Sequence, residues 1–179
     1  MRPPDAVSTP PTSAGHVDVG ALELYHERHG GGPPLVLLHG AFGTIGSCFS
    51  ALLPALARDF EAIAVELQGH GRTRDIDRPL SYEAMAADTA VLLETLDIAR
   101  ARLVGYSMGG AVGLQLAIDR PELVNRLAFF GGAAFDAGGV YPELQAAFES
   151  FDPHQLDGSA GTRPAAASRP IPTPGRRSS

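Results

Sequence analysis

Three short segments of this sequence are almost continuously apolar and lack the polar–apolar alternation of a strand with one face in water. They are residues 35–38 (LVLL), 62–65 (AIAV) and 127–130 (LAFF). Strands of this kind are typical of a parallel sheet that is covered on both faces. Segments with helical patterns alternate with them, at residues 49–60, 81–98 and 108–120. This order predicts an α/β fold in which a mostly parallel sheet is flanked by helices.

Signals at the ends of the expected elements support this arrangement. Ser81 is expected to cap the N-terminus of the second helix, because a serine hydroxyl can accept a hydrogen bond from a free N–H of the first turn. Pro121 is expected to end the third helix, since proline has no N–H to donate. Residues 21–30 (ALELYHERHG) are expected to form an edge strand.

The two ends of the chain differ in composition from the segment between them. Residues 1–16 carry four prolines among small polar residues, and residues 152–179 are rich in proline, arginine and serine. Such segments cannot bury enough apolar surface to offset the entropy lost on ordering. We therefore expect a folded core at residues 17–151 between a disordered lead-in and a disordered tail.

Global properties exclude several classes of function. The net charge of −6 disfavours a nucleic-acid-binding surface. No apolar run approaches the roughly 20 residues that cross a bilayer, so we expect no membrane insertion. The only cysteine, Cys48, cannot form an internal disulfide. Nothing therefore points to an oxidising compartment, and the cytoplasm is the expected location.

The sequence RLVGYSMGG, residues 102–110, places Ser107 between two glycines at the end of an expected strand. The pattern Gly105-x-Ser107-x-Gly109 fits a sharp turn from a strand into a helix, where bulky side chains would prevent close approach. The amide of Met108 would then lie in the first turn of the helix, where N–H groups have no backbone partner. Ser107 is a candidate nucleophile, and the alternative is a serine at a glycine-rich helix start without chemistry.

A second motif, LVLLHGAFG at residues 35–43, is a strand followed by His-Gly-x-x-Gly. The loop after such a strand can offer another backbone N–H to an oxyanion, and Gly40 allows the backbone to approach a substrate oxygen. A tight turn without a functional role is the alternative. His39 is expected to make a structural hydrogen bond in this turn. His70, in QGHGR, is expected to shape a turn, with a substitute catalytic base as the alternative.

These two motifs, together with AIAVELQGHGRT at residues 62–73, resemble the α/β-hydrolase superfamily in its branch of esterases, lactonases and related hydrolases. The resemblance covers about residues 17–151. It implies that Ser107 is the nucleophile and that the N–H groups of Met108 and Ala41 hold the oxyanion. Phe42 is an alternative donor to Ala41. The family usually has Asp where this chain has Glu66.

The same resemblance implies that Phe42 and Tyr106 line the acyl pocket. It also implies an acid and then a histidine after the serine, following the seventh and eighth strands. This sequence reaches only a sixth strand, at residues 127–130, so we expect an incomplete fold, truncated after that strand and the start of a cap. Asp136 and His154 keep the family's chain order and are the candidate acid and base, although residues 151–159 (FDPHQLDGS) predict a loop.

The resemblance thus implies a serine hydrolase that acts on a small ester, lactone or related acyl compound and needs no cofactor or metal. Because a serine without a base is a poor nucleophile, we expect weak turnover. Two alternatives stay open: an inactive remnant or interaction module that keeps the front half of the fold, and a perhydrolase or acyltransferase that uses the same serine. If the sixth strand is a sheet edge, its unpaired apolar side predicts self-association.

Overall fold

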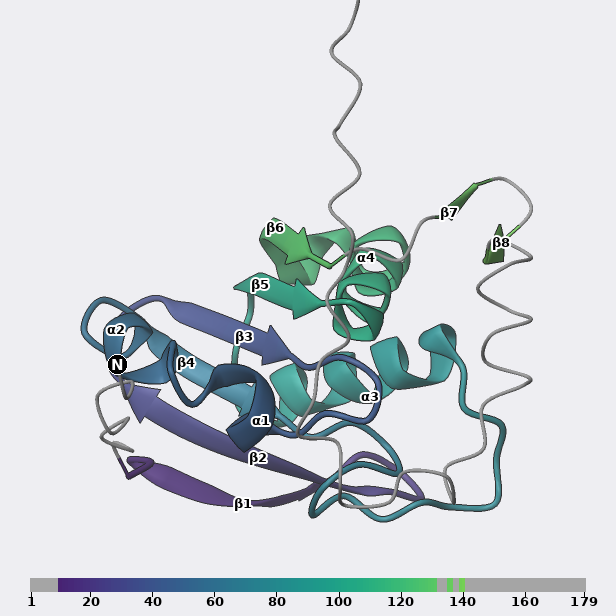
Figure 1. Ribbon diagram of the computed structural model, residues 1–179, viewed down its shortest axis with the longest axis horizontal. Coiled ribbons are helices and arrows are strands. Elements are labelled where there is room, and N and C mark those ends of the chain that lie inside the picture. The colour runs from purple at the N-terminus through teal and green to yellow at the C-terminus, as the bar shows by residue number, and fades with distance from the viewer. Residues whose placement is uncertain (1–9, 132–134, 137–138, 141–179) are drawn as a thin grey trace, which may run out of the picture. The chain divides into compact units, whose positions relative to one another are not determined.

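The computed structural model describes residues 10–131, 135–136 and 139–140 (Figure 1). Residues 10–131 contain a six-stranded sheet with the spatial order β1-β2-β4-β3-β5-β6. The strands are β1 (Ser13–Asp18), β2 (Glu23–Gly30), β3 (Pro34–Leu38), β4 (Glu61–Val65), β5 (Ala101–Tyr106) and β6 (Val124–Phe130). The helices are α1 (Ile45–Phe49), α2 (Leu53–Leu56), α3 (Tyr82–Thr95), α4 (Met108–Asp119) and the 3-10 turn η1 (Pro121–Leu123).

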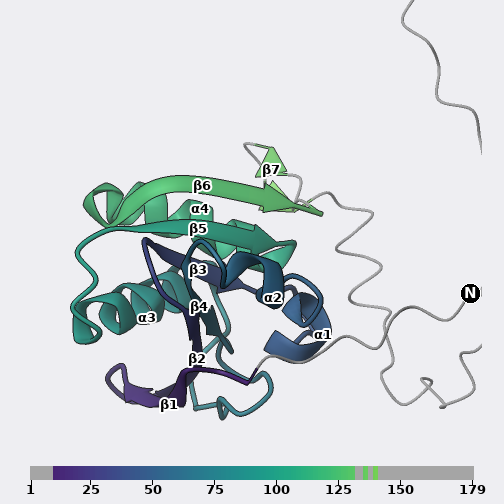
Figure 2. The same cartoon turned by 90° about the vertical axis from the view of Figure 1, so that its left-hand side faces the viewer.

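Four neighbouring strands, β4, β3, β5 and β6, run parallel, and β1 and β2 are antiparallel additions at one side. Helices α3 and α4 cover one face of the sheet and the short helices α1 and α2 lie on the other (Figure 2). This confirms the predicted α/β class with a mostly parallel sheet.

The central strands β3 and β4 send alternate side chains into two separate apolar clusters. Val36, Leu38, Ile63 and Val65 belong to the cluster that includes α3 and α4. Leu35, Leu37, Ala62 and Ala64 belong to the cluster that includes α1 and α2. All eight side chains are buried. The absence of polar alternation in the sequence therefore reflects burial on both faces.

The helix-end signals act as predicted. The Ser81 hydroxyl accepts a hydrogen bond from the Ala84 N–H, at 3.1 Å, and α3 begins at the next residue. Helix α4 ends at Asp119, two residues before Pro121. Its last turn is closed by a 2.8 Å hydrogen bond from the Arg120 N–H to the Leu116 carbonyl.

Three expectations about the first 60 residues were wrong. The single helix expected at residues 49–60 is divided into the end of α1 and the separate helix α2, in whose first turn Pro54 lies, because proline cannot donate to a preceding turn. Strand β2 is not an edge, since it lies between β1 and β4. Strand β1 already begins at Ser13, within the expected lead-in 1–16, because backbone pairing with β2 needs no apolar side chains.

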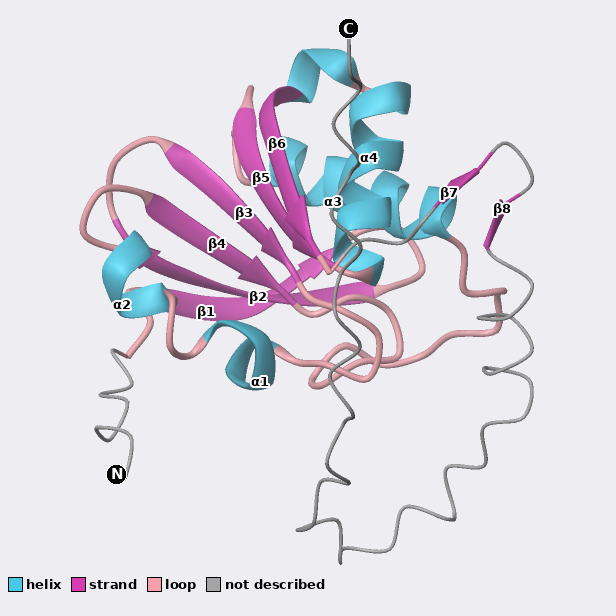
Figure 3. Ribbon diagram, turned by 45° about the horizontal axis from the view of Figure 1, so that its top comes forward, coloured by secondary structure: helices cyan, strands magenta, loops and turns pink. Residues whose placement is uncertain are grey.

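Strand β6 pairs with β5 on one side and is the outermost strand of the sheet among the described residues (Figure 3). Phe129 and Phe130 at its end are 54% and 47% exposed. Farther along the chain, β7 (Phe135–Asp136) and β8 (Gly139–Val140) form a short antiparallel pair that belongs to a separate unit. The expected core–tail boundary after residue 151 lies outside the described residues. None of the described helices is long and apolar enough to span a membrane.

Candidate active site

Ser107 lies on the bend between β5 and α4, in a backbone conformation that is rare for a residue with a side chain. Its φ is 49° and its ψ is −115°. The bend is fixed from both sides by backbone hydrogen bonds. The Ser107 N–H donates to the Phe130 carbonyl at 2.9 Å, and the Ser107 carbonyl accepts from the Gly110 N–H at 2.9 Å. Strain of this kind persists only where the surrounding structure holds it.

The glycines on both sides of Ser107 allow the strand and the helix to meet without side chains between them. A Cβ atom on Gly105 would lie 2.5 Å from the Gly109 carbonyl oxygen. A Cβ atom on Gly109 would lie 2.0 Å from the carbonyl oxygen of Leu38, at the end of β3. The glycine spacing read from the sequence therefore serves close packing of α4 against both β5 and β3.

The Ser107 hydroxyl does not cap the helix that it precedes, although serine usually does so at this position. Met108 is the first residue of α4, so its N–H has no acceptor within the helix. The partial positive charge at a helix N-terminus favours an anion at this amide. The side chain of Ser107 and the amide of Met108 are thus adjacent in sequence and free of the hydrogen bonds of regular structure.

The predicted second donor lies in a turn directly beside the bend. The Gly43 N–H donates to the Gly40 carbonyl at 3.1 Å and closes the turn. A Cβ atom on Gly40 would lie 3.3 Å from the Cβ of Ser107 and 2.8 Å from the Tyr106 ring. The turn therefore packs against the bend, and the amide nitrogen of Ala41 is bonded directly to the Gly40 carbonyl carbon.

The two residues proposed for the acyl pocket, Phe42 and Tyr106, both have exposed aromatic side chains. Phe42 has a φ of 58° and is 76% exposed. Tyr106 is 39% exposed, and its ring centroid lies 5.3 Å from that of Phe130. Tyr106 is the last residue of β5, and its ring packs beside Gly40, in the turn that contains Phe42.

Two histidine rings connect the turn at residues 40–43 with the loop that follows β4. His39 Nδ1 is 2.8 Å from the Gly40 carbonyl oxygen, and the Leu67 N–H donates to His39 Nε2 at 3.0 Å. The second ring is that of His70, and its centroid lies 4.9 Å from the centroid of the His39 ring. Burial lowers the pKa of His39 below its ordinary value, which favours the neutral ring that accepts the Leu67 N–H. The predicted structural role of His39 agrees with these contacts.

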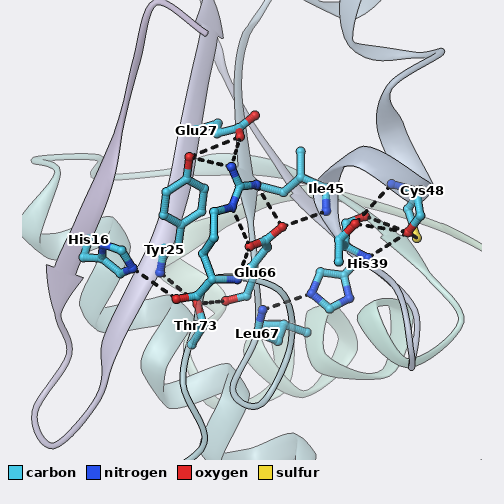
Figure 4. A network of polar contacts seen from close by, with 12 residues as sticks. His16, Tyr25, Glu27, His39, Ile45, Cys48, Glu66, Leu67 and Thr73 are labelled. Atoms are coloured by element: carbon cyan, nitrogen blue, oxygen red, sulfur yellow. Dashed lines mark hydrogen bonds and ion pairs between the residues drawn. The ribbon is translucent and has the colours of Figure 1, made fainter. Parts of the chain in front are cut away.

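Glu66 is buried at the end of β4 and holds the same loop (Figure 4). Its carboxylate accepts two hydrogen bonds from the Arg72 guanidinium, at 2.9 and 3.0 Å, and one from the Arg72 N–H at 2.6 Å. It also accepts a longer bond, 3.3 Å, from the Ile45 N–H at the start of α1. Burial alone would raise the pKa of Glu66, but the hydrogen bonds and charge of Arg72 outweigh it and lower the pKa.

Arg72 extends this network to the antiparallel side of the sheet. Its guanidinium donates to the Tyr25 hydroxyl and to Glu27, both at 2.8 Å, and stacks 3.8 Å above the Tyr25 ring. The Thr73 hydroxyl donates to the Glu66 carbonyl at 2.6 Å. In the sequence, Glu66 is visible only as a departure from the family's usual Asp, and this network is not predicted. The buried acid six residues before an arginine was the available signal.

The candidate acid and base lie outside the part of the chain in which the structure describes Ser107 and its surroundings. Asp136 lies in β7, in the separate unit, and only its backbone is described. His154 lies outside the described residues. Within the part of the chain that the structure describes, no group of three or more His, Cys, Asp or Glu side chains could hold a metal ion.

Known proteins similar to this chain include several hydrolases. The chain is 34% identical over 115 residues to pyrrolizixenacetamide deacetylase of Xenorhabdus hominickii, which covers 64% of this chain and 43% of that protein. It is 35% identical over 117 residues to fluoroacetate dehalogenase of a Burkholderia species, which covers 63% of this chain and 38% of that protein. The chain therefore spans less than half the length of these curated relatives.

Among solved structures, the fold is similar to that of Est816, described as an N-acyl homoserine lactone degrading enzyme. The TM-score is 0.66 at 30% sequence identity, over 75% of this chain and 52% of that chain. The family model described as the alpha/beta hydrolase fold matches residues 33–178, which is most of the sequence. Sheet order, strand–turn–helix bend and family match agree, and the chain belongs to the α/β-hydrolase fold family.

Proposed function

We propose that this chain is a serine hydrolase that cleaves a small ester, lactone or related acyl substrate through Ser107. The hydroxyl oxygen bonds to the acyl carbon, and the N–H groups of Ala41 and Met108 stabilise the negative carbonyl oxygen that results. Collapse of this intermediate expels the leaving alcohol, and water then hydrolyses the acyl-serine. His154, oriented by Asp136, is the proposed base that takes the serine proton and returns it to the leaving group.

The observation that carries the proposal is that Ser107 has a strained backbone conformation and that its hydroxyl does not cap α4. A serine that caps a helix typically contributes about 0.5–2 kcal/mol, and this hydroxyl makes no such bond. Its backbone conformation also costs on the order of 1–3 kcal/mol. A residue that gives up stability in both ways is expected where the hydroxyl has a chemical role.

The substrate class rests on the surroundings of the bend and on the relatives. Tyr106 directly precedes Ser107, and Phe42 lies in the turn that packs against Ser107 through Gly40; both offer exposed apolar surface, which suits an acyl group. Two of the similar proteins are named for acyl chemistry, one as a deacetylase and one as an enzyme that degrades N-acyl homoserine lactones. The dehalogenase relative marks the breadth of the family, so the acyl class is the narrower part of the proposal.

Covalent labelling with a fluorophosphonate, followed by peptide mass spectrometry, tests the proposal. We expect labelling on the Ser107 peptide, loss of labelling in Ser107→Ala, and unchanged labelling in Ser50→Ala, in which another serine is removed. His154→Ala and Asp136→Asn should slow labelling by at least about tenfold if they form the base and its acid. A folded chain that is labelled no faster than Ser107→Ala contradicts the proposal.

The same assay separates the alternative functions. A folded chain with neither labelling nor ester cleavage fits a non-catalytic interaction module. If the serine is labelled, turnover of a chromogenic acetate ester in the presence of hydrogen peroxide or a primary alcohol identifies the acceptor. Formation of peracid or of a new ester, rather than free acid, would assign a perhydrolase or an acyltransferase.

A further inference from the structure

We propose that His70 is a positioning residue that holds the Phe42 N–H and thereby leaves the Ala41 N–H as the oxyanion donor. The inference rests on the proposed function and decides between two neighbouring amides that the sequence leaves as alternatives. The Phe42 N–H donates to His70 Nε2 at 3.3 Å. No hydrogen bond joins the Ala41 N–H to another described residue.

The partners of the His70 ring fix its tautomer. Nδ1 is 2.8 Å from the Gln68 carbonyl oxygen, which can only accept, so Nδ1 carries the proton. The Phe42 N–H can only donate, so Nε2 must present its lone pair. The ring is therefore neutral and protonated on Nδ1. The Gln68 carbonyl sets the ring so that it accepts on the side of the turn.

The turn gives this hydrogen bond a mechanical role. Phe42 has a positive φ, which costs free energy for a residue with a side chain. The bond to His70 fixes the peptide unit between Ala41 and Phe42, which carries the Phe42 N–H, while the Ala41 N–H belongs to the preceding peptide unit, after Gly40. Because the turn packs against Ser107 through Gly40, a rotation of this peptide unit would release the Phe42 N–H from His70 and let it compete with the Ala41 N–H for the reacting oxygen.

The positioning role can be tested by substitution of His70, because its ring is not part of the apolar core. His39 connects the same two loops but is fully buried, so its replacement would combine positional and folding effects. His70 is only partly buried and adjoins the exposed Phe42. Its substitution should change the turn while the sheet remains folded, which far-UV circular dichroism can verify.

The tautomer is measured directly by NMR on the full chain with 15N-labelled histidine, at about pH 8. We expect one histidine with a protonated Nδ1 and a bare Nε2 whose signals disappear in His70→Gln. The Phe42 amide resonance should shift in the same variant. A His70 ring that is protonated on Nε2, or on both nitrogens, overturns the inference. This measurement does not depend on catalysis, so its failure is separate from failure of the proposed function.

The labelling rate of Ser107 gives the second readout. His70→Ala should slow labelling about fivefold to tenfold, the effect of losing one net hydrogen bond. His70→Gln, whose amide oxygen can accept the Phe42 N–H, should restore the rate to within about twofold. His16→Ala removes a histidine–backbone bond to the Arg72 carbonyl, in the same loop as His70 but with no contact to the turn at residues 40–43, and should leave the rate unchanged. Equal rates for wild type and His70→Ala contradict the positioning role.

Discussion

Replacement of Gly109 by alanine should destabilise the fold strongly, although alanine is the better helix former. The added Cβ would lie 2.0 Å from the Leu38 carbonyl oxygen and 2.7 Å from that of His39. Both obstacles are backbone atoms, and Leu38 belongs to a central strand. Relief of the clash to a tolerable 3.0 Å requires the start of α4 to move by about 1 Å, the difference between the two distances, and Ser107 must move with it.

The magnitudes decide the sign of this effect. Glycine to alanine within a helix stabilises by about 1 kcal/mol, whereas overpacking costs about 1–3 kcal/mol even where side chains can yield. Since backbone yields less, we expect a cost of at least about 3 kcal/mol, the top of that range. After the gain in helix propensity is subtracted, the net loss of unfolding free energy is at least about 2 kcal/mol, a considerable part of a typical 5–15 kcal/mol. Urea unfolding followed by far-UV circular dichroism measures it, because the chain has no tryptophan.

Gly46→Ala in α1 is the matched control. Its Cβ would meet nothing closer than the Thr44 hydroxyl oxygen at 3.8 Å, which is an ordinary contact. Without a clash, the helix-propensity gain should leave the protein as stable as wild type or up to about 1 kcal/mol more stable. If Gly109→Ala unfolds at the same urea midpoint as Gly46→Ala, close packing of α4 on β3 is not what the glycine provides.

Two further predictions concern pH and association. Burial lowers the pKa of His39, so near the ordinary histidine pKa of 6.5 this ring binds a proton in the unfolded chain but not in the folded chain. The unfolding free energy should therefore fall as the pH drops below that value. His39→Gln should flatten this slope between about pH 7.5 and 5.5, and an unchanged slope would exclude His39 as its source. We also expect the outer side of β6 to pair between two copies of the chain. Phe129→Lys should therefore lower the mass measured by analytical ultracentrifugation, whereas the control Leu80→Lys, at another exposed apolar side chain, should not. A wild-type chain that sediments as a monomer would contradict this prediction.

Much of the fold could be predicted because it depends on short-range patterns. The apolar runs of β3 and β4 indicate that both faces of these strands are buried. Ser81 and Pro121 mark helix ends because one can accept a hydrogen bond from the first turn and the other cannot donate one. The place of β2 could not be predicted, since strand order depends on which backbones pair across the sheet. Strand β1 was missed for the same reason: its pairing with β2 uses backbone groups that composition does not reveal.

In the candidate site, too, the features set by neighbouring residues could be predicted, and those set by contacts between distant residues could not. The bend at Ser107 follows from glycines two residues away on each side, a local signal that the backbone conformation repeats. The bonds of His39 to Leu67 and of Phe42 to His70 each join residues 28 positions apart. Such contacts depend on the register of β3 beside β4, and no short motif encodes that register. Sequence therefore indicated the turn but not what holds it.

The Ser107 amide is bonded to the end of β6, the outermost strand among the residues that the structure describes, and not to the middle of the sheet. Strand ends at a sheet margin fray locally at a small fraction of the free energy of global unfolding. Each fraying of the β6 end releases that amide, so the conformation of the bend is less durable than the β3–β4 centre. A partner that paired along the outer side of β6 would reduce this fraying and prolong the bent backbone conformation at Ser107.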